Sequence, residues 1–201
     1  TGKTFLAKNI AKTMTGTGNK SHIGFVQFHP SYDYTDFVEG LRQTKPNNNG
    51  QIGFELKDGI FKEFCRNAAN AKKDDDKKGK EVQKFVFIID EINRGDISKI
   101  FGELFFSIDP GYRGEKGMIK TQYNNMITGD NDVFKDGFYV PENVYIIGTM
   151  NDIDRSVESM DFAMRRRFAW YEVTAESSMT MLDNEEAWKN QGKECKKPEG
   201  E

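Results

Sequence analysis

An unbroken apolar run from Phe85 to Ile89, which ends in the adjacent carboxylates Asp90 and Glu91, constrains the fold of this chain more than any other feature. Successive side chains of a strand point to opposite faces of its sheet, so a strand without polar alternation needs apolar cover on both faces. Helices supply that cover in parallel α/β sheets. The run therefore predicts the central strand of a parallel sheet that is flanked by helices.

The segments before and after this run alternate between helix and strand patterns. Apolar residues at helical spacing predict a first helix from about Thr4 to Thr15. Asp58 and Asp96 are each placed to cap a further helix, the second of which is expected to reach Ile108, and Val157 to Met164 is expected to form a short one. This alternation predicts an α/β fold. The other predicted strands are His22 to Phe28, Asn143 to Met150 and Phe168 to Val173.

Three polar segments are expected to connect these elements. Turn residues fill Thr44 to Gly53, and charged residues fill Lys72 to Lys84, which therefore cannot bury apolar area. Pro110 to Gly137 is long and rich in glycine, with Ile119 to Tyr123 as a candidate short strand. Long loops in compact domains are usually functional or mobile.

The length of the chain, 201 residues, predicts one domain. Because the chain is polar and charged from Glu176 onward, we expect a core over residues 1–174 and a polar tail without a domain of its own over 175–201. The chain opens on Thr1 rather than on Met and a basic segment, so we expect a fragment of a longer protein without a signal peptide.

Composition excludes some classes of function. With 29 Lys and Arg against 32 Asp and Glu, the net charge of -3 supplies no general attraction for nucleic acid or an anionic membrane. No apolar stretch approaches the roughly 18 residues of a membrane-spanning helix. Cys65 and Cys195 lie far apart with no CxxC spacing, which favours reduced thiols and a cytoplasmic location.

The first residues carry a phosphate-binding signal. Gly2, Lys3 and Thr4 match the end of the loop GxxxxGK[ST] and open the first predicted helix, as that motif requires. Alone, this tripeptide is weak evidence, because a glycine before a helix and a solvated lysine often occur together by chance. Its interpretation depends on a partner elsewhere in the chain.

The two acids that follow the central strand supply that partner. Ligands of open α/β sheets bind at the carboxyl ends of the strands. The simpler alternative is that both acids cap the next segment, but a buried strand gains nothing from two adjacent anions unless a cation or a reacting water offsets their repulsion. We expect Asp90 to hold Mg²⁺ together with Thr4, and Glu91 to polarise the attacking water of a nucleoside triphosphatase.

A third group of polar residues follows the predicted strand at Asn143 to Met150. The amide of Asn151 can orient a water near the γ-phosphate without adding negative charge, although asparagine is also a common turn residue. Asp154 and Arg155 follow on the same short connection. Such a combination of amide, acid and guanidinium usually organises a network around a ligand.

Arginines at positions 165 to 167 end the last predicted helix. A favourable interaction with the helix dipole explains them, and so does a role in reaching the nucleotide of a neighbouring subunit. An arginine that acts in this way raises the rate of phosphoryl transfer by roughly 10³ to 10⁵. The NKxD and DxxG segments of small G proteins are absent, so the sequence leaves the choice between GTP and ATP open.

Short motifs follow one another along the chain: Gly2 to Thr4, Val26 to Tyr32, Lys57 to Phe61, Ile88 to Arg94, Tyr139 to Tyr145, Met150 to Ser156 and Arg165 to Phe168. In this combination they resemble the McrB family, the AAA+ motors of modification-dependent restriction systems, which are close to the dynein-related AAA group. The resemblance covers about Thr1 to Val173. It implies a P-loop NTPase core of the AAA+ class, of which the first strand and the helical lid are not found in this chain.

The resemblance also implies an activity and partners. The family members form a ring, which we expect to be a hexamer, that hydrolyses GTP or ATP with Mg²⁺. The expected partners are an McrC-like nuclease subunit, which stimulates hydrolysis, and DNA, which is bound through the full-length complex. Lys3 and Thr4 carry over as Walker A positions and Asp90 and Glu91 as the Walker B pair. The remaining carried-over residues are Asn151, Asp154 and Arg155, as the signature that links hydrolysis to the nuclease, and Arg166 and Arg167, as arginine fingers.

Two other functions fit parts of the sequence. A MoxR-like or dynein-related AAA ATPase that remodels protein assemblies would share the same nucleotide motifs. A small-molecule kinase with a P-loop fits less well, because Asn151 and the arginine triplet would then have no role.

Overall fold

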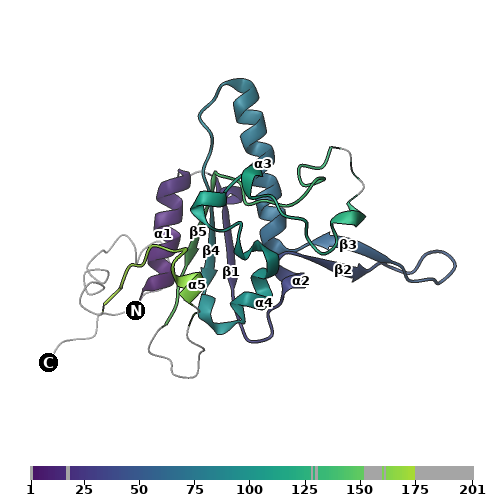
Figure 1. The fold of residues 1–201 in the computed structure, drawn as a ribbon, viewed down its shortest axis with the longest axis horizontal. Helices are drawn as coiled ribbons and strands as arrows, with labels where there is room; N and C mark the ends of the chain where they lie inside the picture. The colour runs from purple at the N-terminus through teal and green to yellow at the C-terminus, as the bar shows by residue number, and fades with distance from the viewer. Residues whose placement is uncertain are drawn as a thin grey trace, which may run out of the picture.

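The computed structural model describes residues 2–16, 19–127, 129, 131–151, 160 and 162–174. Helices and strands alternate along the first part of the chain, and a long segment without regular strands precedes the last strand (Figure 1). The helices are α1 (Lys3–Thr15), α2 (Tyr34–Phe37), α3 (Ile60–Lys78), α4 (Ile97–Phe101) and α5 (Phe162–Arg165), and the strands are β1 (Ile23–Gln27), β2 (Glu39–Gln43), β3 (Phe54–Asp58), β4 (Phe85–Asp90) and β5 (Val144–Gly148).

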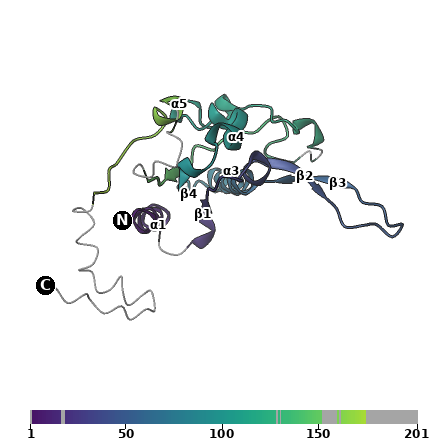
Figure 2. The ribbon, with the colours of Figure 1, turned by 90° about the horizontal axis from the view of Figure 1, so that it is seen from below.

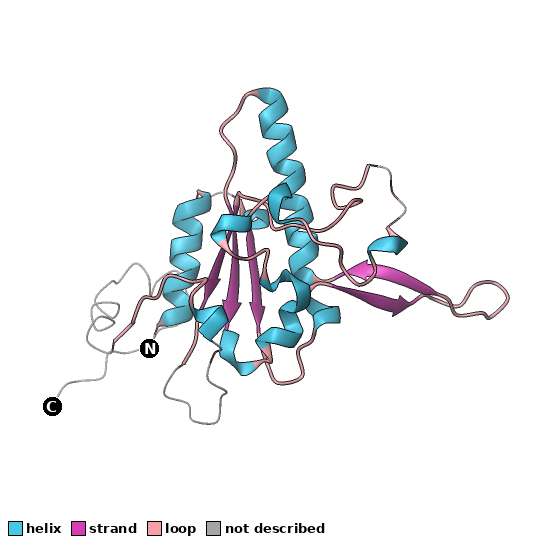
Figure 3. Cartoon of the chain, viewed as in Figure 1, coloured by secondary structure: helices cyan, strands magenta, loops and turns pink. Residues whose placement is uncertain are grey.

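A parallel sheet forms the centre of the molecule, with the strand order β1–β4–β5. All residues of β4 are buried. Val86 and Ile88 pack against α1, whereas the alternate residues Phe85, Phe87 and Ile89 belong to a larger core shared with α2, α3 and α4. Figure 2 shows α1 and α4 on opposite sides of the strands, and Figure 3 shows the three strands running side by side. The apolar run is thus a central strand covered on both faces, as its sequence predicts.

Aromatic rings fill the larger of the two cores. Phe37 of α2 stacks on Phe61 of α3 with ring centroids 4.8 Å apart, and Phe87 of β4 meets Phe61 edge-on at 5.0 Å. Gly24 of β1 leaves room for this packing, because a Cβ there would lie 2.3 Å from the Phe87 ring. Interlocked rings of this kind fix the helices against β4 and so fix where β4 ends.

The predicted strands at His22 to Phe28 and Asn143 to Met150 are confirmed as β1 and β5, but the one at Phe168 to Val173 is wrong. These residues form no strand, and Trp170 and Tyr171 are exposed. The Trp170 indole instead donates to the carbonyl of Arg165 at 2.8 Å. Because Trp170 forms its hydrogen bond with a residue nearby in the sequence, this segment does not need to pair with a neighbouring strand.

Two other short elements are only partly as expected. Within Ile119 to Tyr123, only Ile119 makes a strand-like pair, with Phe138. Most of the helix predicted over Val157 to Met164 lies outside the described residues, and its described part, α5, extends to Arg165.

The expectation of a connector over Lys72 to Lys84 is wrong for its first half, because α3 continues to Lys78. Gly79 ends the helix in the left-handed conformation, with φ at 61°. Asp75 is buried, and its carboxylate accepts hydrogen bonds from the backbone and side-chain amides of Gln83, both at 3.2 Å. The helix thus buries the Asp75 carboxylate with hydrogen-bond partners. The charged composition of this segment does not predict that it is helical or partly buried.

The helix ends also differ in part from expectation. Asp96 caps α4 as predicted, by accepting from the Lys99 amide at 3.1 Å, but α4 ends at Phe101 rather than at Ile108 because Gly102 turns the chain at φ 51°. Asp58 does not cap α3, since Gly59 occupies that position and Asp58 is the last residue of β3.

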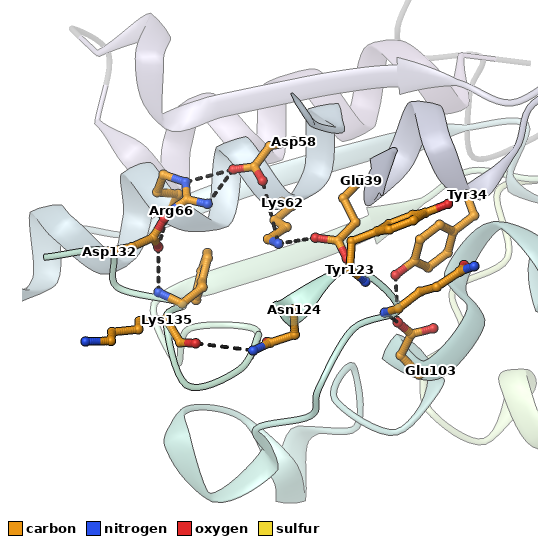
Figure 4. Close-up of polar contacts among 12 residues, drawn as sticks. Tyr34, Glu39, Asp58, Lys62, Arg66, Glu103, Tyr123, Asn124, Asp132 and Lys135 are labelled. Carbon is orange, nitrogen blue, oxygen red and sulfur yellow. Dashed lines mark hydrogen bonds and ion pairs between the residues drawn. The ribbon is translucent and has the colours of Figure 1, made fainter. Parts of the chain in front are cut away.

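An antiparallel hairpin of β2 and β3, which the sequence patterns do not predict, projects from the sheet (Figures 1 and 2). The predicted loop at Thr44 to Gly53 is confirmed as its turn. At its base, Glu39 of β2 forms an ion pair with Lys62 of α3, and both side chains are completely buried (Figure 4). The hairpin is therefore fixed to the same helix that packs on the central sheet.

The ion pair is part of a longer network that reaches the loop after α4 (Figure 4). Asp58 lies 3.6 Å from the Lys62 ammonium and 2.6 Å from the Arg66 guanidinium, which also pairs with Asp132. The amide of Tyr123 donates to Glu39 at 3.2 Å. The loop predicted over Pro110 to Gly137 is therefore bound to α3 through Asp132 and to β2 through Tyr123.

The described part of the chain contains no helix with the length and apolar character that crossing a membrane requires. Cys65 of α3 is a free thiol that is completely buried. Burial raises the pKa of the Cys65 thiol well above its ordinary value, more than the nearby Arg113 lowers it. This cysteine is therefore protonated and unreactive at neutral pH.

We predict that Lys62→Met lowers the free energy of unfolding by about 3–5 kcal/mol, because it leaves the buried Glu39 charge without its ammonium partner. Urea unfolding followed by circular dichroism measures this change. Lys57→Met, at an exposed lysine of β3, is the matched control and should stay within about 0.5 kcal/mol of the wild type. Equal stability of the two variants would contradict the assigned role of the buried pair.

Candidate functional site

A cavity of about 310 Å³ lies where the amino end of α1 meets the carboxyl ends of β4 and β5. Its position follows from the parallel sheet, because parallel strands present their carboxyl ends at one edge. Three groups of residues that the sequence singles out lie together here, namely the start of α1, Glu91 and Asn151. The lining residues are Gly2, Lys3, Thr4, Phe5, Glu91, Thr149, Met150 and Asn151.

The first turn of α1 is suited to an anion. Gly2 precedes the helix in the left-handed conformation, with φ at 59°, which glycine adopts without strain. The first turn contains no acidic residue, so the positive end of the helix dipole is not neutralised there. The Lys3 side chain forms no ion pair or hydrogen bond with any residue in the described ranges, and its ammonium is thus available to a ligand.

Asp90 lies behind the cavity wall, where two hydroxyl groups bind one of its oxygens. Thr4 Oγ1 donates to Asp90 Oδ1 at 2.6 Å, and Thr149 Oγ1 donates to the same atom at 2.5 Å. The other oxygen, Oδ2, accepts no hydrogen bond from the described residues. Asp90 is buried and does not itself line the cavity.

This donor set fits a hydrated Mg²⁺ better than a cation held by protein ligands alone. The described residues contain no group of three or more His, Cys, Asp or Glu that could hold a metal. Mg²⁺ usually keeps several waters and binds one or two carboxylates together with substrate phosphates. The free oxygen of Asp90 and the hydroxyl of Thr4 match that requirement.

Glu91 adopts a backbone conformation that is rare for its residue type. Its φ of 54° is the only positive value at a non-glycine residue in the described part of the chain. The Glu91 amide donates to Thr149 Oγ1 at 3.3 Å, and Arg94 Nε donates to Glu91 Oε2 at 3.0 Å. Residues held in such conformations often occur at functional sites. The turn separates the two adjacent acids, with Glu91 at the cavity wall and Asp90 behind it.

Asn151 lines the cavity and is linked to the turn after β4. The side-chain amide of Asn93 donates to the carbonyl of Asn151 at 3.4 Å. Asn93 is buried, and its Oδ1 has no hydrogen-bond partner among the described residues. The two strand ends therefore contact each other through a polar side chain as well as through the sheet.

The arginines at the end of α5 do not line this cavity. The Arg167 guanidinium packs over the ring of Phe105, 4.4 Å from its centroid, and donates to the carbonyl of Ala163. The Arg166 side chain is exposed and contacts no described residue through a hydrogen bond or ion pair. Asp154 and Arg155, which the sequence also predicts at the site, lie outside the described residues.

Sequence patterns miss three residues of this site, Thr149, Asn93 and Arg94. Thr149 is one of several β-branched residues at strand ends, and nothing in its pattern distinguishes it. Asn93 and Arg94 lie two and three positions after Glu91, within the motif Ile88 to Arg94, and this place in the motif is the signal that could have identified them.

Comparison with known proteins places the chain among nucleotide-dependent domains. A family model described as the AAA domain of the dynein-related subfamily matches residues 1–168. The EcoKMcrB subunit of a type IV methyl-directed restriction enzyme of Escherichia coli (strain K12) is 43% identical over 172 residues, which is 86% of this chain and 33% of that protein. YdiS, a component of the type II restriction enzyme BsuMI of Bacillus subtilis (strain 168), is 29% identical over 107 residues, which is 52% of this chain and 30% of that protein. The chain thus spans about a third of the length of these relatives.

We predict that Lys3→Ala weakens the binding of a fluorescent nucleoside triphosphate at least about 10-fold, because it removes a charge-assisted contact to phosphate. Fluorescence anisotropy of the full-length protein measures the affinity. Lys8→Ala, which removes an exposed lysine from the same helix, is the matched control and should bind as the wild type does. If both variants bind equally well, the amino end of α1 is not the phosphate site.

Proposed function

Because this chain belongs to the dynein-related subfamily of AAA domains, we propose that it is the Mg²⁺-dependent nucleoside triphosphatase core of a motor subunit in a DNA restriction system. Membership confirms the expected α/β core of the AAA+ class. The identity of 43% with the E. coli subunit confirms the expected resemblance to the McrB family. The motor activity, the choice of nucleotide and the partners are our proposals.

The observation that carries this proposal is the hydrogen bond of 2.6 Å between Thr4 and Asp90. It joins the end of the phosphate-binding motif to Asp90, the last residue of the central strand, across 86 positions of the sequence. A triphosphate at the start of α1 and a cation beside Asp90 would therefore be neighbours. Two motifs that are each weak evidence alone lie together, as a nucleotide site requires.

The residues of the cavity suit the steps of hydrolysis. Lys3 and the first amides of α1 would bind the phosphates, and Thr4 with Asp90 would hold the cation. When bound, Mg²⁺ neutralises charge on the β- and γ-phosphates. Glu91 would orient the attacking water and accept its proton, and Asn151 would orient that water without adding negative charge.

A ring of subunits would complete the site, because the described cavity contains no arginine. Arg166 is exposed and suited to reach the nucleotide of a neighbouring subunit. Arg167 packs on Phe105 of its own chain, which favours a role in holding α5. We expect a hexamer, and we propose that the remaining signature residues Asp154 and Arg155 link hydrolysis to the partner that stimulates it.

DNA would be bound elsewhere in the full-length complex, since a net charge of -3 gives this chain no general attraction for a polyanion. We propose an McrC-like nuclease subunit as the partner that cuts the DNA. The buried free thiol of Cys65 is in keeping with a cytoplasmic location. Remodelling of a protein assembly, the activity expected of MoxR-like relatives, is the alternative outcome of the experiment below.

We predict that Glu91→Gln abolishes turnover of GTP or ATP by the full-length protein and leaves nucleotide affinity within about 3-fold, since a neutral amide cannot accept the proton of the attacking water. Phosphate release measures turnover, and Glu55→Gln, on the exposed hairpin, is the control. Turnover that survives in Glu91→Gln would remove Glu91 from this role.

The same assay, run with GTP and with ATP, identifies the nucleotide and the partner. Addition of the protein encoded next to this one in the genome should raise turnover if that protein is a nuclease of the restriction system. If the neighbour instead carries a metal-dependent adhesion domain and no nuclease, the remodelling function is favoured over restriction.

We predict that Arg166→Ala lowers turnover by roughly 10³-fold or more, as the loss of an arginine finger does. Because Lys3 and Arg166 would belong to different subunits of one site, mixing the Arg166→Ala and Lys3→Ala proteins should restore part of the activity. Arg165→Ala, which removes an exposed arginine stacked on Trp170, is the control. Mixed rings that assemble but stay inactive would contradict a role in trans.

A further inference from the structure

Thr149, the residue after β5, contacts four consecutive residues at the end of β4. Its amide donates to the carbonyl of Ile89 at 2.9 Å, and its carbonyl accepts from the amide of Ile92 at 2.9 Å. Its hydroxyl donates to Asp90 Oδ1 at 2.5 Å and accepts from the Glu91 amide at 3.3 Å. The two backbone bonds would form with any residue except proline at this position, but the two side-chain bonds require a hydroxyl.

The direction of the side-chain bonds follows from the chemistry of the groups. A hydroxyl has one hydrogen to donate and two lone pairs that accept. The Asp90 carboxylate can only accept when ionised, and the Glu91 amide can only donate. Thr149 is buried, with 8% of its surface exposed, so water does not readily replace either bond. One hydroxyl group therefore bridges the Asp90 carboxylate and the backbone amide of Glu91.

The bridge spans the point where the backbone turns into the left-handed conformation at Glu91, with φ at 54° and ψ at 45°. A residue other than glycine stays in this conformation only when its surroundings hold it there. Thr149 binds the amide of Glu91 and the carboxylate of the preceding residue, and so acts on both sides of the turn. Thr149 also lines the cavity beside Glu91.

From this geometry we propose that Thr149 is a positioning residue of the hydrolysis reaction, whose hydroxyl holds the backbone turn at Glu91 and thereby keeps the Glu91 carboxylate where it can orient the attacking water. This inference rests on the proposed function, because it assigns Thr149 a role in the same site. Thr149 acts through Glu91 and Asp90, and it exchanges no proton with the substrate.

The proposal predicts a specific kinetic effect of Thr149→Val, which keeps the shape of the side chain and removes the hydroxyl. Displacement of a catalytic group by about 1 Å can lower a rate by 10²-fold, so we expect kcat to fall by about 10- to 100-fold. Nucleotide affinity should change by less than about 3-fold, since Lys3 and the start of α1 remain intact. Thr149→Ser retains the hydroxyl and should keep kcat within about 3-fold of the wild type.

Thr121→Val provides a matched control for the loss of a buried threonine hydroxyl. Thr121 is 5% exposed, and its Oγ1 has no hydrogen-bond partner among the described residues. It lies in the loop after α4, outside the lining of the cavity. This variant should therefore keep the kcat of the wild type.

The experiment measures kcat, KM, nucleotide affinity and thermal unfolding for the full-length wild type and the three variants, with whichever of GTP and ATP the wild type hydrolyses. A loss of kcat in Thr149→Val, with affinity and melting temperature preserved and with rescue by Thr149→Ser, supports the proposal. An unchanged kcat in Thr149→Val overturns it, and so does an equal loss in Thr149→Ser.

Two further outcomes keep the result interpretable. If Thr149→Val unfolds at a lower temperature, kcat is measured below that transition, and recovery of the wild-type value there overturns the positioning role. If the wild type hydrolyses neither GTP nor ATP, with or without its partner, the proposed function itself fails, which is distinguishable from a failure at Thr149.

Discussion

The hydrogen bond from Thr4 to Asp90 is the interaction on which the arrangement of the cavity depends, because it joins the first turn of α1 to the carboxyl end of the central strand. A helix start alone offers amides to any anion, and a strand end alone offers carboxylates to any cation. Their contact places an anion site beside a cation site, which is what a magnesium-bound triphosphate requires. Thr149 extends the contact to the next strand, since its hydroxyl binds the same oxygen of Asp90.

The interior of the protein explains why this contact can be made reliably. Phe61 and Phe87 lock α3 against one face of β4, and α1 packs on Val86 and Ile88 at the other face. Close packing of this kind leaves β4 little freedom to shift along its axis. Asp90 at the end of the strand and Glu91 after it therefore keep a fixed position relative to α1. A different interaction, the buried ion pair of Glu39 and Lys62, holds the hairpin to α3.

The central strand and its helical cover could be predicted because a run such as Phe85 to Ile89 is stable only when both faces are buried. The proximity of Lys3 to Glu91 could also be predicted, since parallel strands end at one edge of their sheet. The bridge made by Thr149 could not, because β-branched residues at strand ends look alike in sequence and their partners are set by tertiary packing. The hairpin could not be predicted for a similar reason, because the ion pair that fixes it joins Glu39 to Lys62, which lies far away in the sequence.

The most direct test of the account is the environment of the cation in the full-length protein, with Mn²⁺ in place of Mg²⁺ and a non-hydrolysable triphosphate bound. Electron–nuclear double resonance detects phosphorus nuclei next to the manganese. The account predicts a phosphorus coupling in the wild type that is lost in Asp90→Asn. Manganese that shows the same coupling in both proteins, or none in the wild type, would contradict the convergence of Lys3, Thr4 and Asp90 on one nucleotide.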